Sequence, residues 1–390
     1  MNIIKTLLIM ESIILTMPCP GLPPIIKWAG GKERELSYIV EKAPKEFNRY
    51  FEPFVGGGSV FAAIIAKEYY VNDKSDELIA LYMAIKNRDQ KTFKTLAAVN
   101  ESWKYVYGFV SDHMPELSSI YLLYRKNDIS DVMVKDKLRK FINENFQTLV
   151  EGLGCMRLDD VRYRAELERN VVQKYCRMKK IETSRHLMPD SDLADNVRTA
   201  FMGSLYMYYR YLYNKRSEFG RSDLNVALFV FIRNYAYSGM FRYNSDGDFN
   251  VPYGGIGYNS KTLDKKLAYY QSDSLVEHFK KATVECLDFM DFFRKHPPLE
   301  GDFIFLDPPY DSDFSTYAKN EFGKFDQERL AKYLVEECKG KWLMIIKNTP
   351  FIYSLYDKPG IKIKMFDKKY QVSFMNRNDK EVEHLIITNY

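Results

Sequence analysis

The chain has 390 residues, 46% hydrophobic and 15% aromatic, so it can bury a large core and is long enough for two or three domains. A formal net charge of only +5 excludes a histone-like polycation. The five cysteines are dispersed without a CxxC pair, and the five histidines do not cluster near them, which argues against a zinc site or a disulfide framework and favours a reducing cytoplasm.

Residues 1–22 form an apolar N-terminal extension. The run from Ile3 to Met17 is interrupted by Lys5 and Glu11 and is shorter than a membrane-spanning helix needs. A signal-peptide core is one alternative. The sequence favours a short helical extension, or an upstream start codon with Met17 just before the first motif. We treat the segment as accessory and expect no membrane association.

The first segment with a functional pattern runs from Pro24 to Lys32. Its two glycines, Gly30 and Gly31, allow the backbone to approach a ligand, and Lys32 offers a cation for a carboxylate or phosphate. The GxxxxGK[ST] spacing of a phosphate-binding P-loop is absent.

Residues 50–61 predict a strand, a glycine turn and a helix. Ser59 is the predicted N-cap of a helix that runs to about Tyr69. The glycine turn at 56–58 can bring backbone N–H groups and a helix N-terminus up to a ligand. A short second strand then ends in Asp73, about 20 residues on, where an acid typically binds the ribose hydroxyls of an adenosine-containing cofactor.

The pattern from about Leu78 to Asn225 predicts a mostly helical insert, with helices over Val134–Gln147 and Asp159–Lys180. Between positions 125 and 185 there are 15 Lys and Arg against 10 Asp and Glu, so this segment carries the whole positive excess of the chain. Such a distribution is expected of a module that faces a polyanion, and equally of a solvated helical face. The 30 tyrosines and 26 phenylalanines are compatible with base stacking and with core packing.

An apolar helix from Asn225 to Tyr235 leads into the segments Tyr235–Asn244 and Gly247–Gly255. These segments are rich in turn formers, aromatic residues and side-chain amides, which predicts an exposed hairpin or loop. Because this is a costly way to join two elements, the pattern indicates a binding role.

Alternation of strands and helices then resumes. Strands are predicted at Thr283–Cys286, Asp302–Leu306 and Trp342–Lys347, helices at Leu287–Arg294 and Asp326–Cys338, and a closing antiparallel pair at Ile361–Phe366 and Glu383–Tyr390.

The strand at Asp302–Leu306 is apolar enough to be buried on both faces. Pro308 and Pro309 end it, because two prolines remove two backbone donors. Asp307 and Tyr310 are therefore expected on a stiff turn at the carboxyl end of a central strand, where open α/β sheets bind ligands. An ordinary Pro-Pro turn is the alternative.

Four stretches occur in one order: WAGGK at Trp28–Lys32, EPFVGGGS at Glu52–Ser59, FRYN…GDFNVPYG at Phe241–Gly254, and DPPY at Asp307–Tyr310. Together they resemble the Dam-type DNA adenine-N6 methyltransferases, the D12 class of the alpha group. The resemblance covers roughly residues 24–85 and 205–390, and residues 90–205 have no counterpart.

The resemblance implies an α/β fold: a seven-stranded, Rossmann-like sheet that binds S-adenosylmethionine, with an inserted, mostly helical target-recognition domain. It places the catalytic domain at 23–88 and 226–390 and the insert at 89–225. The implied cofactor site comprises Trp28, Ala29, Gly30, Lys32, Phe54, Gly56, Gly57, Gly58, Ser59, Asp73 and Asp307.

The implied DNA contacts follow the insert: Tyr237, Ser238, Arg242, Asn244 and Pro252. Tyr237 matches an aromatic residue that inserts beside the flipped base. Arg242 matches an arginine that reads guanine, a base whose O6 and N7 suit a bidentate guanidinium. Asn244 matches a residue that contacts the DNA backbone. Ser238 replaces a frequent Asn, and Gly255 a common basic residue, so the resemblance does not specify a GATC target.

The implied catalytic residues are Asp307, Pro308, Pro309 and Tyr310. An exocyclic adenine amine is a poor nucleophile because its lone pair is delocalised into the ring. Asp307 can accept one N–H and the Pro308 carbonyl the other, which favours the tetrahedral nitrogen of the transition state. Tyr310 can stack on the extruded base. The sulfonium supplies the driving force, so no metal is required.

We therefore expect methyl transfer to N6 of a flipped adenine in double-stranded DNA. The alternatives are a cytosine-N4 or RNA amino-methyltransferase, and a catalytically inactive DNA-binding regulator. The insert is expected to contact DNA, and a cognate restriction endonuclease is a second candidate partner. One complete set of motifs suffices in a monomer.

Overall fold

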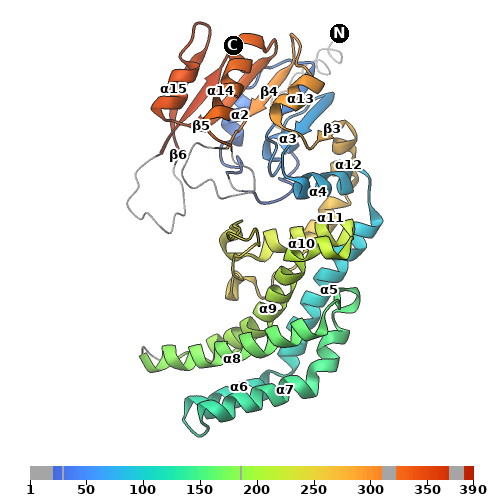
Figure 1. The fold of residues 1–390 in the computed structure, drawn as a ribbon, viewed down its shortest axis with the longest axis vertical. Helices are drawn as coiled ribbons and strands as arrows, with labels where there is room; N and C mark the ends of the chain where they lie inside the picture. The colour runs from blue at the N-terminus through green and yellow to red at the C-terminus, as the bar shows by residue number, and fades with distance from the viewer. Residues whose placement is uncertain (1–20, 29, 185–186, 310–321, 369–381) are drawn as a thin grey trace, which may run out of the picture. The chain divides into compact units, whose positions relative to one another are not determined.

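The computed structural model describes residues 21–28, 30–184, 187–309, 322–368 and 382–390 (Figure 1). The chain divides into two compact units. The first unit takes in the described residues up to Lys74 and those from Asp273 onward, apart from the gaps given above. The second unit spans Ser75–Ser272, which is wider than the predicted insert at 89–225.

The first unit contains one seven-stranded sheet in the order β3-β2-β1-β4-β5-β7-β6. Its strands are β1 (Arg49–Glu52), β2 (Glu68–Asn72), β3 (Ala282–Glu285), β4 (Phe303–Leu306), β5 (Lys341–Lys347), β6 (Lys362–Lys368) and β7 (Val382–Thr388). The strands from β3 across to β5 pair in parallel, whereas β7 is antiparallel to both β5 and β6. The predicted α/β fold, its seven-stranded sheet and its closing antiparallel pair are confirmed.

The order of the strands reverses between β1 and β4. These neighbours pair through Tyr50 with Phe303 and through Phe51 with Ile304. Open α/β sheets form their ligand sites outside the carboxyl ends of the strands at such a reversal. The segments that follow β1 and β4 therefore flank the expected position of a site.

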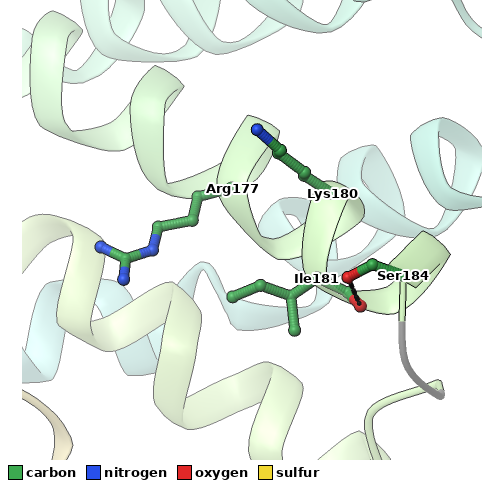
Figure 2. A pocket seen from close by; sticks show the side chains of 4 residues that line it. All are labelled: Arg177, Lys180, Ile181 and Ser184. Atoms are coloured by element: carbon green, nitrogen blue, oxygen red, sulfur yellow. Dashed lines mark hydrogen bonds between the residues drawn. The ribbon is translucent and has the colours of Figure 1, made fainter.

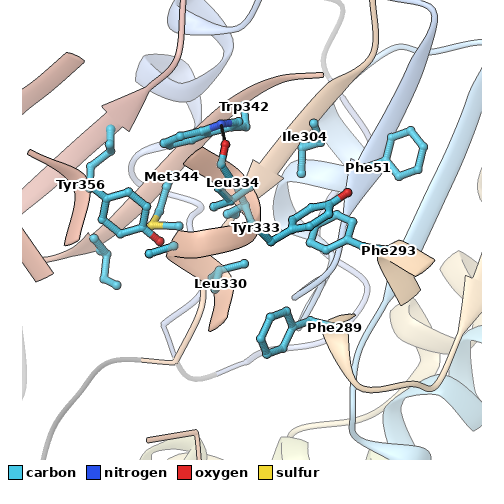
Figure 3. Close-up of a cluster of buried hydrophobic side chains, with 14 of the residues drawn as sticks. Phe51, Phe289, Phe293, Ile304, Leu330, Tyr333, Leu334, Trp342, Met344 and Tyr356 are labelled. Atoms are coloured by element: carbon cyan, nitrogen blue, oxygen red, sulfur yellow. Dashed lines mark hydrogen bonds between the residues drawn. The ribbon is translucent and has the colours of Figure 1, made fainter. Parts of the chain in front are cut away.

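Both faces of the central strands are covered. On one face, Ile304 of β4 and Trp342 and Met344 of β5 join a buried cluster with three helices (Figure 3). The helices are α13 (Phe289–Lys295), α14 (Lys324–Lys332) and α15 (Pro350–Tyr356). The Trp342 indole N–H donates to the Leu334 carbonyl at 3.1 Å. Because alternate residues of a strand face opposite sides, buried Phe305 shows that the other face is covered as well.

The helix after the glycine turn is shorter than predicted. α3 comprises only Ser59–Ala63, and its N-cap is Gly58 with a φ of 71°. The predicted N-cap role of Ser59 and the helix running to Tyr69 are therefore wrong. Tyr69 instead belongs to β2, and its hydroxyl donates to the Ile64 carbonyl at 3.0 Å. This tertiary contact joins the segment after α3 to the sheet. The apolar residues of that segment had predicted a longer helix.

The other helices of the first unit are α2 (Leu36–Lys42) and α12 (Asp273–Lys280). α14 continues into a π-helical turn at Tyr333–Glu337. α13 and α14 correspond to the predicted helices at Leu287–Arg294 and Asp326–Cys338.

The second unit is helical, as predicted. It contains α4 (Asp76–Lys86), α5 (Gln90–Asp112), α6 (Met114–Arg125), α7 (Asp131–Glu151), α8 (Asp160–Ser184), α9 (Asp190–Asn214), α10 (Ser222–Tyr235) and α11 (Asp264–Tyr270). Tyr206, Tyr208, Tyr209 and Tyr213 of α9 are fully buried, so part of the aromatic content serves core packing. In the described part of the chain, no helix combines the length and the apolar character that a membrane crossing requires.

Candidate active site

The glycine turn after β1 is built to receive the segment that contains Trp28. The Ile25 N–H donates to the Gly57 carbonyl at 3.0 Å. A Cβ atom on Gly57 would lie 2.4 Å from the Ile26 carbonyl oxygen, and one on Gly56 would lie 2.8 Å from the Trp28 indole. Any side chain at these two positions would therefore push the two segments apart, so the glycines are needed for a close approach within the chain itself.

Asp73 lies at the same turn. One of its carboxylate oxygens accepts a hydrogen bond from the Gly56 N–H at 3.0 Å. The Val55 N–H donates to the Asn72 carbonyl at 2.9 Å, which aligns the turn with the end of β2. The structure thus places the predicted ribose-binding acid next to the predicted glycine turn.

Asn72 holds three segments together, a role the sequence analysis missed. Its buried side-chain NH2 donates to the Pro53 carbonyl at 3.1 Å and to the Leu287 carbonyl at 3.0 Å. Its side-chain oxygen accepts from the Leu287 N–H at 2.9 Å. A buried amide with three satisfied hydrogen bonds rigidifies its surroundings. An amide at the end of an apolar strand, next to the acid, is the signal that could have identified it.

Lys32 and Asp307 form an ion pair. Lys32 is only 2% exposed, and its Nζ also donates to the Gly30 carbonyl at 2.8 Å. Asp307 follows β4 directly, as predicted, and its side chain is 19% exposed. Lys32, the cation that the sequence assigned to a ligand, therefore contacts the carboxylate of the DPPY motif, which was predicted to be catalytic.

A side chain of α14 forms a hydrogen bond with the second proline after Asp307. The buried Gln327 side chain donates to the Pro309 carbonyl at 2.9 Å. Pro308 is buried and Pro309 is exposed. Tyr310 and Ala29, both predicted site residues, lie outside the described residues.

Glu52 is a buried acid that the sequence analysis did not assign to the site. It is the last residue of β1, is 2% exposed, and accepts a hydrogen bond from the Tyr50 hydroxyl at 2.7 Å. Burial raises its pKa well above the ordinary value, and the negative charge of Asp307 raises it further, against the opposing effect of Lys32. The neutral form of Glu52 is therefore favoured beside the Lys32–Asp307 pair.

Two further predicted cofactor residues lie along the same turn. The half-buried Phe54 ring contacts the rings of Phe289 and Phe322, with centroids 5.6 and 5.5 Å apart. Ser59 is buried at the start of α3. The structure thus gathers the described residues of the predicted cofactor and catalytic sets at the carboxyl edge of the sheet, around β1, β2 and β4.

The predicted DNA-binding residues lie on one loop of the second unit. Antiparallel bridges join Ala236 with Tyr253 and Tyr243 with Phe249, so the loop is a hairpin, as predicted. The Tyr237 N–H donates to the Pro252 carbonyl at 2.9 Å. Tyr237 is half-buried, and the other members of the set are exposed: Ser238, Arg242, Asn244 and Pro252.

Hydrogen bonds close the tip of this hairpin and join the neighbouring residue to α9. The side-chain oxygen of Asn244 accepts from the N–H groups of Asp246 and Asp248 at 3.1 and 2.8 Å, which closes the tip. Next to it, the Tyr243 hydroxyl lies 3.1 Å from the Tyr213 hydroxyl of α9. Because Asn244 shapes the loop, its expected contact with the DNA backbone is an additional role.

Ser238 has a left-handed backbone conformation, with φ 52° and ψ 16°. Asn adopts this conformation more readily than most residues with a side chain. Ser238 therefore holds this conformation at a higher conformational energy than Asn would.

Several basic residues of the insert make contacts inside the helical unit. The Arg162 guanidinium pairs with Glu166 at 2.6 Å. Arg164 lies 3.9 Å from the ring centroid of Phe146, and the Lys179 Nζ lies 3.9 Å from that of Tyr124. Part of the positive excess therefore holds helices together.

A shallow pocket along the end of α8 retains exposed basic groups. Figure 2 shows its lining residues, which are Arg177, Lys180, Ile181 and Ser184. The Ser184 hydroxyl donates to the Ile181 carbonyl at 3.0 Å. Arg177 and Lys180 are both exposed, so this part of the insert can present positive charge to solvent.

The comparison with protein families gives one match of high coverage. The model described as "D12 class N6 adenine-specific DNA methyltransferase" matches residues 28–151 and 170–373. Most of the helical insert lies within this match. The expectation that residues 90–205 have no counterpart in the resembling family is therefore wrong.

Curated relatives are similar over nearly the whole chain. The Type II methyltransferase M.CviBI of Paramecium bursaria Chlorella virus NC1A is 24% identical over 375 residues, covering 95% of this chain and 100% of that protein. M.MjaIII of Methanocaldococcus jannaschii is 26% identical over 385 residues, covering 94% and 99%. The DNA adenine methylase of Haemophilus influenzae is 23% identical over 374 residues, covering 92% and 90%.

Proposed function

The chain belongs to the D12 class of N6 adenine-specific DNA methyltransferases, and from this premise we propose that it methylates adenine within one short DNA sequence, using S-adenosylmethionine as the donor. The observation that carries the proposal is the Lys32–Asp307 ion pair directly after β4, at the strand-order reversal, together with Asp73 bonded to the glycine turn after β1. A donor site and an acceptor for the adenine amine meet there.

The residues at this edge fit S-adenosylmethionine. Asp73, which accepts a hydrogen bond from the Gly56 N–H, is proposed to accept further hydrogen bonds from the two ribose hydroxyls. The Cβ-free surface at Gly56 and Gly57 keeps Trp28 against the turn, where its ring can cover the donor. When bound, the donor supplies an electrophilic methyl group on a sulfonium.

Asp307 is proposed to act on the adenine amine. Its carboxylate accepts one N–H while the Pro308 carbonyl accepts the other, which favours the pyramidal nitrogen and its developing positive charge. Lys32 pairs directly with this carboxylate. Proton release can follow methyl transfer, so Asp307 need not be a strong base.

DNA recognition is proposed to use the hairpin and the exposed face of α8. Arg242 is proposed to read a guanine, Tyr237 to insert beside the flipped base, and Pro252 and Asn244 to contact the backbone. Arg177 and Lys180 are better candidates for phosphate contacts than Arg162, Arg164 and Lys179, because the latter three are engaged within the helical unit. Reversing the charge of Arg177 and Lys180 should lower DNA affinity and flatten its salt dependence.

The enzyme is proposed to act as a monomer, with a cognate restriction endonuclease as a candidate partner in the cell. The decisive test is single-molecule sequencing of DNA from cells that express the chain. N6-methyladenine in one short motif supports the proposal and supplies the target sequence. N4-methylcytosine, or methylation of RNA alone, would overturn it, and an Asp307→Asn control should leave the DNA unmodified.

A further inference from the structure

Arg242 and Asn250 face each other across the two strands of the hairpin and are joined twice. The Asn250 N–H donates to the Arg242 carbonyl at 3.0 Å. The Arg242 Nε–H donates to the Asn250 side-chain oxygen at 2.9 Å. Asn250 therefore orients the exposed guanidinium of Arg242, and the backbone hydrogen bond between the two residues holds Asn250 in position.

The residues next to this pair are packed in the interior of the helical unit. Phe241 and Phe249, each adjacent to one member, are buried, with ring centroids 5.2 Å apart. The guanidinium carbon of Arg233 lies 4.6 Å from the Phe241 ring centroid. Because side chains alternate along an extended strand, packing these rings inward turns Arg242 and Asn250 toward solvent.

We propose that Asn250 is a positioning residue for base recognition, which holds Arg242 through Nε so that its two terminal amino groups point outward as a fork. This rests on the proposed function, in which Arg242 reads a guanine. A planar guanidinium carries five N–H donors, and the terminal nitrogens carry four of them. With Nε–H bound to Asn250, the end-on fork is the edge presented to the O6 and N7 acceptors of guanine.

An amide suits this task better than a carboxylate. An acid at position 250 would hold Arg242 through an ion pair, but it would also neutralise the arginine and repel the nearby phosphates. The neutral oxygen of Asn250 orients the guanidinium and leaves its charge available for DNA. Asn250 is thus expected to act on specificity more than on overall affinity.

The test measures kcat/KM for the target duplex and for duplexes in which each guanine of the target is replaced in turn. The wild-type enzyme first defines the target, and Arg242→Ala identifies the position that Arg242 reads. Asn250→Ala should lower discrimination at that same position by on the order of tenfold. In the Arg242→Ala background, Asn250→Ala should cause no further loss, because it acts only through Arg242.

Two matched variants separate positioning from other roles. Asn250→Asp keeps the acceptor for Nε–H, so it should preserve discrimination even where added negative charge lowers affinity. Asn244→Ala removes a second exposed amide of the same hairpin, one that does not bond Arg242, and should weaken all duplexes alike.

The outcomes distinguish the two levels of the proposal. A wild-type enzyme that transfers methyl groups to no adenine would refute the proposed function itself. An active wild type whose Asn250→Ala variant keeps full discrimination would refute the positioning role. Additive losses in the double variant, or lost discrimination in a folded Asn250→Asp variant, would refute it as well. Thermal unfolding of each variant establishes that it is folded, and the Asp variant decides the question if Asn250→Ala unfolds.

Discussion

Lys32 and Asp307 form a partly buried ion pair although 275 positions separate them along the chain. The pair joins the WAGGK segment to the turn after β4, so the donor side and the acceptor side of the site share one electrostatic contact. Lys32 is almost inaccessible to water, so the Asp307 carboxylate compensates a buried ammonium group.

Asp307→Asn should abolish methyl transfer, with at least about a 100-fold loss of kcat, while it retains most of the folding stability. The amide oxygen still accepts a hydrogen bond from Lys32 but no longer carries the negative charge. Transfer from radiolabelled S-adenosylmethionine and denaturant unfolding measure the two effects.

Asp307→Ala should lose the same activity and in addition about 3 kcal/mol of unfolding free energy, because it leaves the Lys32 cation buried without this carboxylate. Appreciable transfer by either variant would disprove the catalytic role of Asp307. Equal stability of the two variants would disprove the structural role of the ion pair.

Gly57→Ala should destabilise the first unit by about 1–3 kcal/mol and weaken cofactor binding, because its Cβ would lie 2.4 Å from the Ile26 carbonyl. Calorimetric titration with S-adenosylmethionine and thermal unfolding test this.

Gly108→Ala is the matched control. Gly108 lies within α5 with no atom within 4 Å of the added Cβ, so this change should stabilise the protein by about 0.5–1 kcal/mol and leave cofactor affinity unchanged. Wild-type cofactor affinity in Gly57→Ala would contradict the proposed fit of the turn.

Glu52→Gln should change how stability depends on pH. Burial raises the pKa of folded Glu52 above the ordinary value of 4.5, so its stabilising contribution is complete below about pH 4.5 and is lost as pH rises through the folded pKa. Gln keeps an acceptor for the Tyr50 hydroxyl and does not titrate. The melting temperature of the wild type should therefore fall relative to Glu52→Gln as pH rises from the ordinary pKa of 4.5 to the higher pKa of folded Glu52. Parallel curves across this range would show that Glu52 is not buried in its neutral form.

Ser238 should tolerate Asn better than Val. At a φ of 52°, Asn relieves conformational strain, whereas a β-branched residue adds about 1–2 kcal/mol. Ser238→Asn should therefore match or exceed the wild type in DNA affinity by fluorescence anisotropy, and Ser238→Val should bind more weakly. If Val bound as well as Asn, the left-handed conformation would not matter for recognition.

Much of the fold was predictable because several of its strands are short apolar runs in the sequence, followed by turn-forming residues. β4 coincides with the apolar residues before Asp307, and the helical insert follows from its long mixed stretches. The prediction of a helix up to Tyr69 was wrong because a tertiary contact, from the Tyr69 hydroxyl to the Ile64 carbonyl, holds this segment in another conformation. Propensity alone does not contain that contact.

The sequence predicted a set of site residues but not the contacts among them. Spacing identified Lys32, Asp73 and Asp307, yet nothing in the spacing showed that Lys32 would contact Asp307. Glu52 escaped notice because a single acid at the end of a strand has no pattern of its own. Arg242 was expected on an exposed loop, but its bond to Asn250 depends on the register of the hairpin, which the sequence did not determine.

The pairing of β1 with β4 has a consequence for synthesis on the ribosome. Arg49 at the start of β1 and Asp302 just before β4 are 253 positions apart and form a salt bridge at 2.6 Å. At about 5–20 residues per second, β1 emerges roughly 10–50 s before its partner is translated. The helical unit is complete by then, whereas β1 still lacks one neighbour. The seven-stranded sheet can therefore close only near the end of translation.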